Sequence, residues 1–278
     1  MKIIKKIFLI IISILILFLI WWLLQTPSLD RNWQLDQKVL SEISFSWNIV
    51  DVKDIRNFKY NSITDYEVWY YDKSYDLDKI ESVYYIIEPF SEYDWPAHTM
   101  LSFWFEDWTY LSVSAEIRKE VWESFSAILW LLNQYEIVYV LWDEKDLIKL
   151  RANYRKDDVF MYPIKANKED IKKLFLSALQ RADKLSKQPE FYNTVYKTCT
   201  TSILDHVNYI RNDKWKNLIS WSTKVFLPSN SDKIAYDLWL IDTELSLEEA
   251  REYYKINELS EKYWDDENYS ELIRKPRK

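Results

Sequence analysis

The sequence predicts an α+β fold in which a mostly antiparallel sheet packs on helices, joined to one N-terminal transmembrane helix. The first observation is a series of short segments in residues 47–165 where apolar and polar residues alternate, as in strands with one buried face. The second is the helical spacing of apolar residues after residue 166. The third is an N-terminal apolar stretch close to the length that spans a bilayer.

The N-terminal segment has the features of an uncleaved membrane anchor. Apart from Ser13, the stretch Ile7–Leu24 is entirely apolar, and about 18 such residues span a bilayer as a helix. Three lysines in the first six residues place the N-terminus in the cytoplasm and the rest of the chain outside. A cleaved signal peptide is the alternative, but no small-residue cleavage site follows the apolar run. We therefore expect residues 1–25 to be a single span in the cytoplasmic (inner) membrane and residues 26–278 to form one extracytoplasmic domain.

Seven segments show the strand pattern, most of them bounded by polar turn residues. The fourth contains two strands joined by a tight turn at Asp107 and Trp108, for which we expect a two-residue hairpin loop. Such a loop requires positive φ, which glycine adopts readily and a bulky side chain resists. The seven segments are 48–55, 65–71, 82–88, 98–117, 135–142, 146–152 and 158–164.

Three later segments have helical periodicity. Asn167 is the expected N-cap of a helix over 168–187. A second helix begins near Thr198, and a third, over 246–263, starts with serine and glutamate at capping-box spacing. The expected buried stripes are Ile171, Leu174, Phe175, Ala178, Leu179, Ala182 and Leu185 in the first helix and Ile203, Leu204, Val207 and Ile210 in the second.

The composition is abnormal in two residue types. The 278 residues include no glycine and 15 tryptophans, whereas an average usage of ~7% predicts on the order of 20 glycines. Several tryptophans stand where a turn favours glycine, namely Trp47, Trp95, Trp108 and Trp142. We interpret most of the tryptophans as glycines encoded by UGA, a codon that some bacterial lineages read as glycine.

The charge argues against nucleic acid as a partner. Outside the anchor the chain has 34 basic and 44 acidic residues. The resulting net charge of −10 repels a phosphate backbone. The sequence shows no metal-ligand spacing, and we expect neither a metal site nor a cofactor.

Cys199 is the single cysteine, so the chain cannot form an internal disulfide. It lies in the first turn of the second predicted helix, with Thr198 as the expected N-cap. The free backbone amides and the helix dipole stabilise a thiolate there, which lowers the pKa of a thiol. Cys199 is therefore a candidate nucleophile. The alternatives are an intermolecular disulfide partner and a small core residue packed beside Ile203.

A thiol nucleophile needs a base, and the chain has two histidines. His206 follows Cys199 by seven residues, about 10 Å along a helix axis, which is too far for a hydrogen bond. We expect a structural role for it. His98 opens a predicted strand and is free to lie beside the helix start in the fold, so it is the candidate base.

The third candidate catalytic residue is Glu116. Across the predicted hairpin, His98 faces either Glu116 or Ile117, depending on the register. A carboxylate opposite the imidazole would orient the ring and stabilise its charged form. The alternative is a solvent-exposed ion pair between Glu116 and Arg118 or Lys119.

Candidate substrate-binding residues flank these positions. Arg151 and Arg155 could bind a phosphate or carboxylate, although charges beside strands are usually solvated. The full set of candidates is Arg118, Arg151, Tyr154, Arg155, Tyr192 and Asn193.

Three segments carry a resemblance to a known family: "AHTMLSFWFEDWTYLSVSAEIRKEVWESF", "LWLLNQYEIVYVLWDEKDLIKLRANYR" and "PEFYNTVYKTCTTSI". From about Asp30 to Arg274 the chain resembles the periplasmic domain of the Lnb-type bacterial lipoprotein N-acyltransferases. That family is similar to the permuted NlpC-type, papain-like thiol enzymes, in which histidine precedes cysteine, as in lecithin retinol acyltransferase. The family pattern has glycine at the positions of Trp104, Trp108, Trp122, Trp130, Trp142 and Trp239.

The resemblance implies a permuted papain-like fold and a thiol mechanism. In it His98 is the base, Cys199 forms an acyl thioester, and the amides around Thr198 and Cys199 stabilise the oxyanion. We accordingly expect a membrane-anchored acyltransferase that moves an acyl chain from a membrane phospholipid to an amine, with a lipoprotein N-terminus as a possible acceptor. The alternatives are a lipid or peptide hydrolase with the same dyad, and a non-catalytic module that binds the cell envelope.

Overall fold

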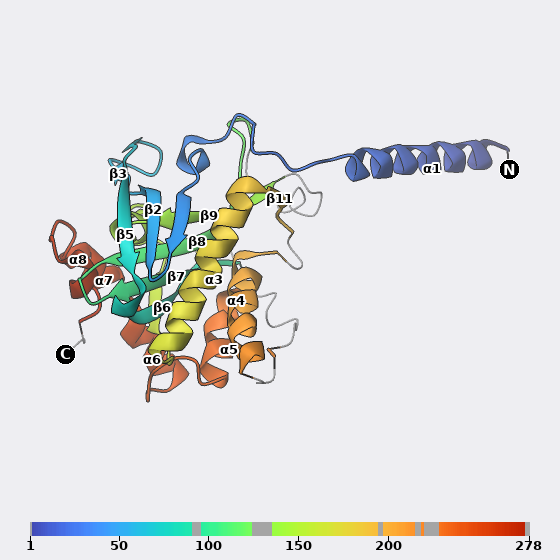
Figure 1. Ribbon diagram of the computed structural model, residues 1–278. Coiled ribbons are helices and arrows are strands. Elements are labelled where there is room, and N and C mark those ends of the chain that lie inside the picture. The colour runs from blue at the N-terminus through green and yellow to red at the C-terminus, as the bar shows by residue number, and fades with distance from the viewer. Residues whose placement is uncertain are drawn as a thin grey trace.

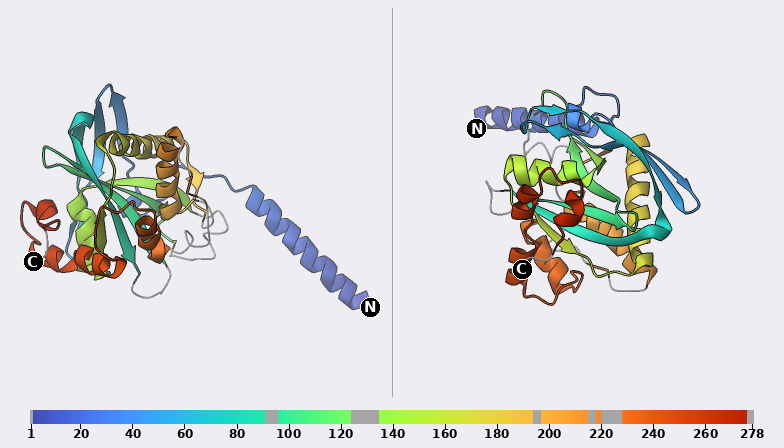
Figure 2. Two further views of the ribbon diagram at one scale, coloured as in Figure 1. Left: turned by 90° about the horizontal axis from the view of Figure 1, so that it is seen from below. Right: turned by 90° about the vertical axis from the view of Figure 1, so that its left-hand side faces the viewer.

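The computed structural model describes residues 2–90, 96–123, 135–193, 197–214, 218–219 and 228–275. Helix α1 (Lys2–Leu23) projects from the body of the domain (Figures 1 and 2). Within it, Ile4–Leu23 is long and apolar enough to cross a membrane, with a mean hydropathy of 2.8 and no residue packed inside the protein. The predicted N-terminal apolar helix is confirmed.

The linker after α1 is attached to the domain within a few residues. The backbone N–H of Ser28 donates to Glu136 Oε1 at 2.9 Å. The guanidinium of Arg31 forms ion pairs of 3.2 Å with Glu136 and with Glu120. These contacts fix the chain beside the start of strand β9 (Glu136–Trp142), five residues after α1 ends.

The domain is built on a nine-stranded sheet whose central four strands are antiparallel neighbours (Figure 1). The order is β1-β2-β9-β8-β7-β6-β10, with β5 paired to β2 and β11 paired to β9, and β3 and β4 form a separate two-stranded sheet. Besides β9, the strands are β1 (Glu42–Ser46), β2 (Ile49–Arg56), β3 (Lys59–Tyr60), β4 (Tyr66–Glu67), β5 (Tyr70–Asp76), β6 (Ile80–Pro89), β7 (Ala97–Phe105), β8 (Tyr110–Arg118), β10 (Phe160–Pro163) and β11 (Glu190–Phe191).

Helices cover both faces of the sheet (Figure 2). On one face α3 and α4 bury a large apolar core, and on the other α2, a π-helix and α8 bury a second one. The predicted α+β class, with an antiparallel sheet packed on helices, is confirmed. The helices of the domain are α2 (Glu144–Ile148), the π-helix (Lys149–Arg155), α3 (Lys168–Lys187), α4 (Cys199–Asp213), α5 (Ser231–Asp237), α6 (Leu247–Tyr254), α7 (Asn257–Lys262) and α8 (Tyr269–Leu272).

Local capping signals explain where two helices start. The Asn167 side chain accepts a hydrogen bond from the N–H of Asp170, so α3 begins as predicted. The predicted helix over 246–263 starts with its capping box but is interrupted. There, the N–H of Ile256 donates to the carbonyl of Val159 at 2.9 Å. This contact with a distant segment divides the helix into α6 and α7.

The strand predicted over 146–152 is wrong, because the segment is helical. The Asp143 side chain caps α2 by accepting a hydrogen bond from the N–H of Lys145. Leu147, Ile148 and Leu150 then pack under the sheet. The spacing of these three apolar residues fits a buried helical turn as well as a strand. The N-cap at Asp143 favours the helix.

The hairpin between β7 and β8 has a three-residue loop instead of the predicted two-residue loop. The N–H of Phe105 donates to the carbonyl of Thr109, and the N–H of Trp108 donates to the carbonyl of Phe105, both at 3.0 Å. This is the pattern of a type I turn followed by a left-handed residue. Only Trp108 needs positive φ, with a value of 62°.

Several tryptophans occupy backbone positions that favour glycine. Positive φ occurs at Trp47, Trp108 and Trp239, and all three indoles are exposed. The buried indole N–H groups of Trp104 and Trp142 have no acceptor among the described residues. Buried donors are normally paired, so these two side chains fit their surroundings poorly. Trp95 and Trp130 lie outside the described residues.

Candidate active site

Cys199 is the first residue of α4, as the sequence predicts. The Thr198 side chain accepts a hydrogen bond from the N–H of Thr201, and the Thr201 hydroxyl accepts one from the N–H of Thr198, forming a capping box. The thiol is buried, and its Sγ lies 3.9 Å from the carbonyl oxygen of Ala97 at the start of β7. The start of α4 therefore faces the first residue of β7, the strand that carries the candidate base.

His98 is the second residue of β7, and its buried side chain interacts with that of Cys199. Its Nε2 lies 2.6 Å from Ser114 Oγ and 2.9 Å from Glu116 Oε1. Because Nε2 is occupied by these two partners, Nδ1 is the nitrogen available to the sulfur. In the register of β7 and β8, Met100 pairs with Ser114. Continuing this register by two residues places His98 opposite Glu116, one of the two predicted neighbours.

The thiol and the imidazole shift each other's protonation in opposite directions. Burial alone raises the pKa of Cys199, but the charge and hydrogen bond of His98, with hydrogen bonds from Thr99, lower it to about 7. Burial lowers the pKa of His98, but the negative charges of Glu116 and Cys199 raise it to about 10. Between these two values the pair exists as a thiolate and an imidazolium.

Glu116 is held as a carboxylate by several partners. Its Oε1 accepts hydrogen bonds from Ser114 Oγ at 2.7 Å and from an Arg151 guanidinium nitrogen at 3.2 Å, in addition to its contact with His98. Burial alone raises the pKa of Glu116, but the charge and hydrogen bond of His98 and the charge of Arg151 bring it well below its usual range. A permanent negative charge therefore lies against the imidazole.

Sequence reasoning missed Glu88 and Ser114. Glu88 is fully buried directly opposite His98 in the register of β6 and β7, and Arg151 Nε donates to its Oε2 at 2.7 Å. Cross-strand neighbours leave the same face of a sheet, so Glu88, His98 and Glu116 form one row. Strand alternation alone assigns these residues to a face, but the register that brings them together is a tertiary property.

His206 has the structural role that was expected. Its Nε2 lies 2.9 Å from the Tyr139 hydroxyl and its Nδ1 lies 2.8 Å from the Ser177 hydroxyl. Burial, with a smaller contribution from the charge of Arg181, lowers the pKa of His206 to about 4. The ring is therefore neutral and occupied on both nitrogens.

The predicted substrate-binding residues are divided between the site and other parts of the fold. Arg118 is buried and donates to the carbonyls of Gln37 and Lys38. Arg151 donates hydrogen bonds to the carboxylates of Glu88 and Glu116. The Tyr154 hydroxyl donates to the carbonyl of Tyr60 in β3. Their assignment to substrate binding stays a prediction.

The other three candidates are Arg155, Tyr192 and Asn193. Arg155 is partly exposed and lies 3.6 Å from Glu88 Oε1. Tyr192 is half-buried, and burial together with the charges of Cys199 and Glu116 raises its pKa. Asn193 pairs with Lys197 at the base of the segment that leads to Cys199. The assignment of these three residues to substrate binding also stays a prediction.

One predicted contribution to the oxyanion site is wrong. The N–H of Thr198 donates to Thr201 Oγ1 at 2.8 Å, so this amide is already occupied. In the first turn of α4, the N–H groups of Cys199 and Thr200 have no acceptor within the described part of the chain. These two amides are the donors that remain for an oxyanion. No group of histidine, cysteine and carboxylate side chains among the described residues could hold a metal ion.

Comparison with known proteins gives one match. A family model for the Lnb N-terminal periplasmic domain matches residues 65–229, more than half of the chain. The matched region includes His98, Glu116 and Cys199. No curated protein and no solved structure matches the sequence.

Proposed function

The chain belongs to the family of the Lnb N-terminal periplasmic domain, and from this premise we propose that it is a thiol acyltransferase at the outer face of the cytoplasmic membrane. A periplasmic domain preceded by one apolar helix fits a single-pass membrane protein whose domain is extracytoplasmic. The proposed donor is a membrane phospholipid, and the proposed acceptor is an amine such as a lipoprotein N-terminus. The order of His98 before Cys199 supports a permuted papain-like arrangement.

The observation that carries the proposal is the pairing of Cys199 with His98. A cysteine buried without a partner has a raised pKa and is inert. Here the pKa of Cys199 falls to about 7 although the thiol is buried, because the imidazole stabilises the thiolate. Packing in the core would not require the Cys199 thiol to lie against His98, a histidine that is itself held by Ser114 and Glu116.

The proposed reaction has two steps. The thiolate attacks the ester carbonyl, the carbon–oxygen bond breaks, and the imidazolium gives its proton to the departing alcohol. A lysophospholipid leaves and a thioester remains on Cys199. An amine then attacks the thioester, His98 takes its proton, and the amide product leaves as the thiolate is restored. The N–H groups of Cys199 and Thr200 would stabilise the oxyanion in both steps.

The first experiment looks for the thioester. Purified full-length protein in phospholipid vesicles is expected to gain the mass of one fatty acyl group, and neutral hydroxylamine should remove it. Cys199→Ala should show no gain. A lipopeptide with a free N-terminal amine should discharge the adduct into an amide, whereas its N-acetylated form should not. Discharge to free fatty acid alone would identify a hydrolase, and the absence of any adduct would contradict the thiol mechanism.

We also propose that most tryptophans are encoded by UGA and are glycine in the native protein. The positive φ values at Trp47, Trp108 and Trp239 support this proposal. Trp33 is a contrast, because its indole is buried and donates to the carbonyl of Leu29 at 2.8 Å. It therefore has the environment of a genuine tryptophan.

The gene sequence tests this proposal directly. We expect TGA codons at Trp104, Trp108, Trp122, Trp142 and Trp239, as well as at Trp130, and TGG at Trp33. Peptide masses of the native protein should show glycine at the TGA positions, since each exchange removes the mass of an indole side chain. TGG at most of the six positions would refute the recoding.

A further inference from the structure

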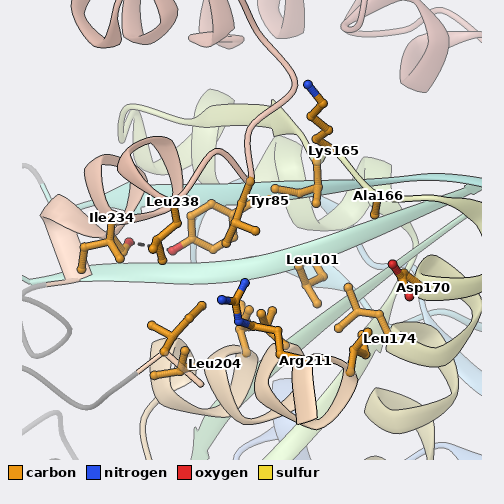
Figure 3. Close-up of a pocket in the computed structure, with 18 of the residues that line it drawn as sticks. Tyr85, Leu101, Lys165, Ala166, Asp170, Leu174, Leu204, Arg211, Ile234 and Leu238 are labelled. Atoms are coloured by element: carbon orange, nitrogen blue, oxygen red, sulfur yellow. Dashed lines mark hydrogen bonds between the residues drawn. The ribbon is translucent and has the colours of Figure 1, made fainter. Parts of the chain in front are cut away.

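An apolar cavity of about 190 Å³ lies beside the candidate nucleophile. Helices α3, α4 and α5, strands β6 and β7, and the segment between β10 and α3 line it, and it is partly open to solvent (Figure 3). Tyr85 and Leu101 line it from the sheet, Ile234 and Leu238 lie beside Tyr85, and Leu204 and Arg211 line it from α4. An apolar cavity of about 150 Å³ is already large enough to bind benzene, so this one can hold a hydrocarbon group.

One face of α4 lines the cavity over nearly its whole length. The lining residues begin at Thr200, directly after Cys199, and end at Lys214. At 1.5 Å per residue this face is about 21 Å long. One leaflet of a bilayer has a hydrocarbon layer about 15 Å thick, which is the space that one lipid acyl chain occupies. The face is therefore long enough for one fatty acyl chain. Between its ends it presents Ile203, Leu204, Val207 and Ile210.

The cavity begins next to the sulfur. Thr200 Oγ1 lies 3.9 Å from Cys199 Sγ and 3.2 Å from Thr99 Oγ1. Thr200 also lines the cavity, so a single side chain separates the sulfur from the apolar space. At the far end, Lys214 and Asp170 form an ion pair of 2.5 Å, and both residues are part of the lining.

We infer that this cavity, the acyl cavity, takes the hydrocarbon chain of the acyl group carried by Cys199. The inference rests on the proposed function and adds the position of the chain and a preference for long chains. A lipid headgroup fits less well, because Arg211 and Lys214 lie at the end of α4 remote from Cys199 and Lys214 is paired with Asp170. Each methylene that enters the cavity should favour binding roughly fourfold.

The experiment compares two substitutions on α4. Val207→Trp places an indole in the acyl cavity, whereas Tyr209→Trp changes an exposed residue two positions away. Acylation of Cys199 is measured with hexadecanoyl and butanoyl nitrophenyl esters. We expect Val207→Trp to lower hexadecanoyl acylation at least tenfold more than butanoyl acylation, and Tyr209→Trp to change neither. An equal effect of Val207→Trp on both esters would refute the acyl cavity while leaving the thiol mechanism intact.

A binding measurement tests the acyl cavity without chemistry. The Cys199→Ala protein should enhance the fluorescence of cis-parinaric acid, a long-chain fatty acid, and adding Val207→Trp should remove the enhancement. Adding Tyr209→Trp should not. Retained binding with Val207→Trp would overturn the inference. Failure of the wild-type protein to accept either ester would overturn the proposed function instead, and parinaric acid binding would still report on the cavity.

Discussion

Replacing His98 by glutamine is expected to slow acylation of Cys199 by a factor of ~10²–10⁴, the usual contribution of a positioned general acid–base group. The variant loses the positive charge that stabilises the thiolate and the proton that the departing alcohol needs. With burial left as the main influence, the pKa of Cys199 should return from about 7 to at least its ordinary value of 9.0. The measurement is the rate of acyl-adduct formation at neutral pH.

Alkylation separates the effect on the thiol from the effect on the acyl transfer. In the wild type, the iodoacetamide rate should rise with pH through a midpoint near 7, and in His98→Gln through a midpoint at or above 9.0. At pH 6 a shift of two pKa units removes about 99% of the thiolate, but a more basic thiolate is intrinsically more reactive. The net loss of rate should be about tenfold.

His206→Gln is the matched control for this experiment. His206 makes hydrogen bonds to Tyr139 and Ser177 and takes no part in the dyad, so its replacement should leave the alkylation midpoint near 7. If the two histidine variants shift the midpoint equally, His98 is not the base and the proposed mechanism fails.

Replacing Glu116 by glutamine should narrow the pH range in which the protein works. The negative charge of Glu116 raises the pKa of His98, so acylation in the wild type should rise through about pH 7 and fall through about pH 10 as the imidazolium loses its proton. Without that charge the pKa of His98 falls. The upper limb should move to lower pH while the lower limb stays near pH 7, and the maximum rate should drop.

The pH profile of acylation distinguishes this effect from loss of folding. Glu106→Gln is a suitable comparison, because Glu106 is exposed and pairs with Lys168 at the opposite end of β7. It should leave both limbs in place. A Glu116→Gln profile with a lower maximum but unmoved limbs would show that Glu116 has no electrostatic role at His98.

Features set by neighbouring residues could be predicted from the sequence. The start of α3 at Asn167 and the place of Cys199 in the first turn of α4 depend on caps that involve residues three positions apart. The sequence pattern also limited the neighbour of His98 to two residues. In the structure the neighbour is Glu116, because the three-residue loop sets the register of β7 and β8.

Features that depend on distant contacts could not be predicted. Arg151 has the same local surroundings in the sequence as a solvated arginine, yet it is buried between Glu88 and Glu116. Nothing in the sequence near residue 151 identifies carboxylates 63 and 35 positions away. The helix over 144–155 was missed for a related reason, since a short apolar run beneath a sheet suits either kind of element.

The attachment of the linker to β9 determines how the rate should depend on lipid. Ser28 is bound to Glu136 only five residues after α1, a span of at most about 18 Å when fully extended. The start of β9 lies at the same end of the sheet as His98 and Glu116. An active site held there would sample the lipids of its own bilayer and few others. Its kinetics should then follow the mole fraction of substrate within that bilayer: diluting the substrate with an inert lipid would slow the reaction, while adding further vesicles of the same composition would leave it unchanged.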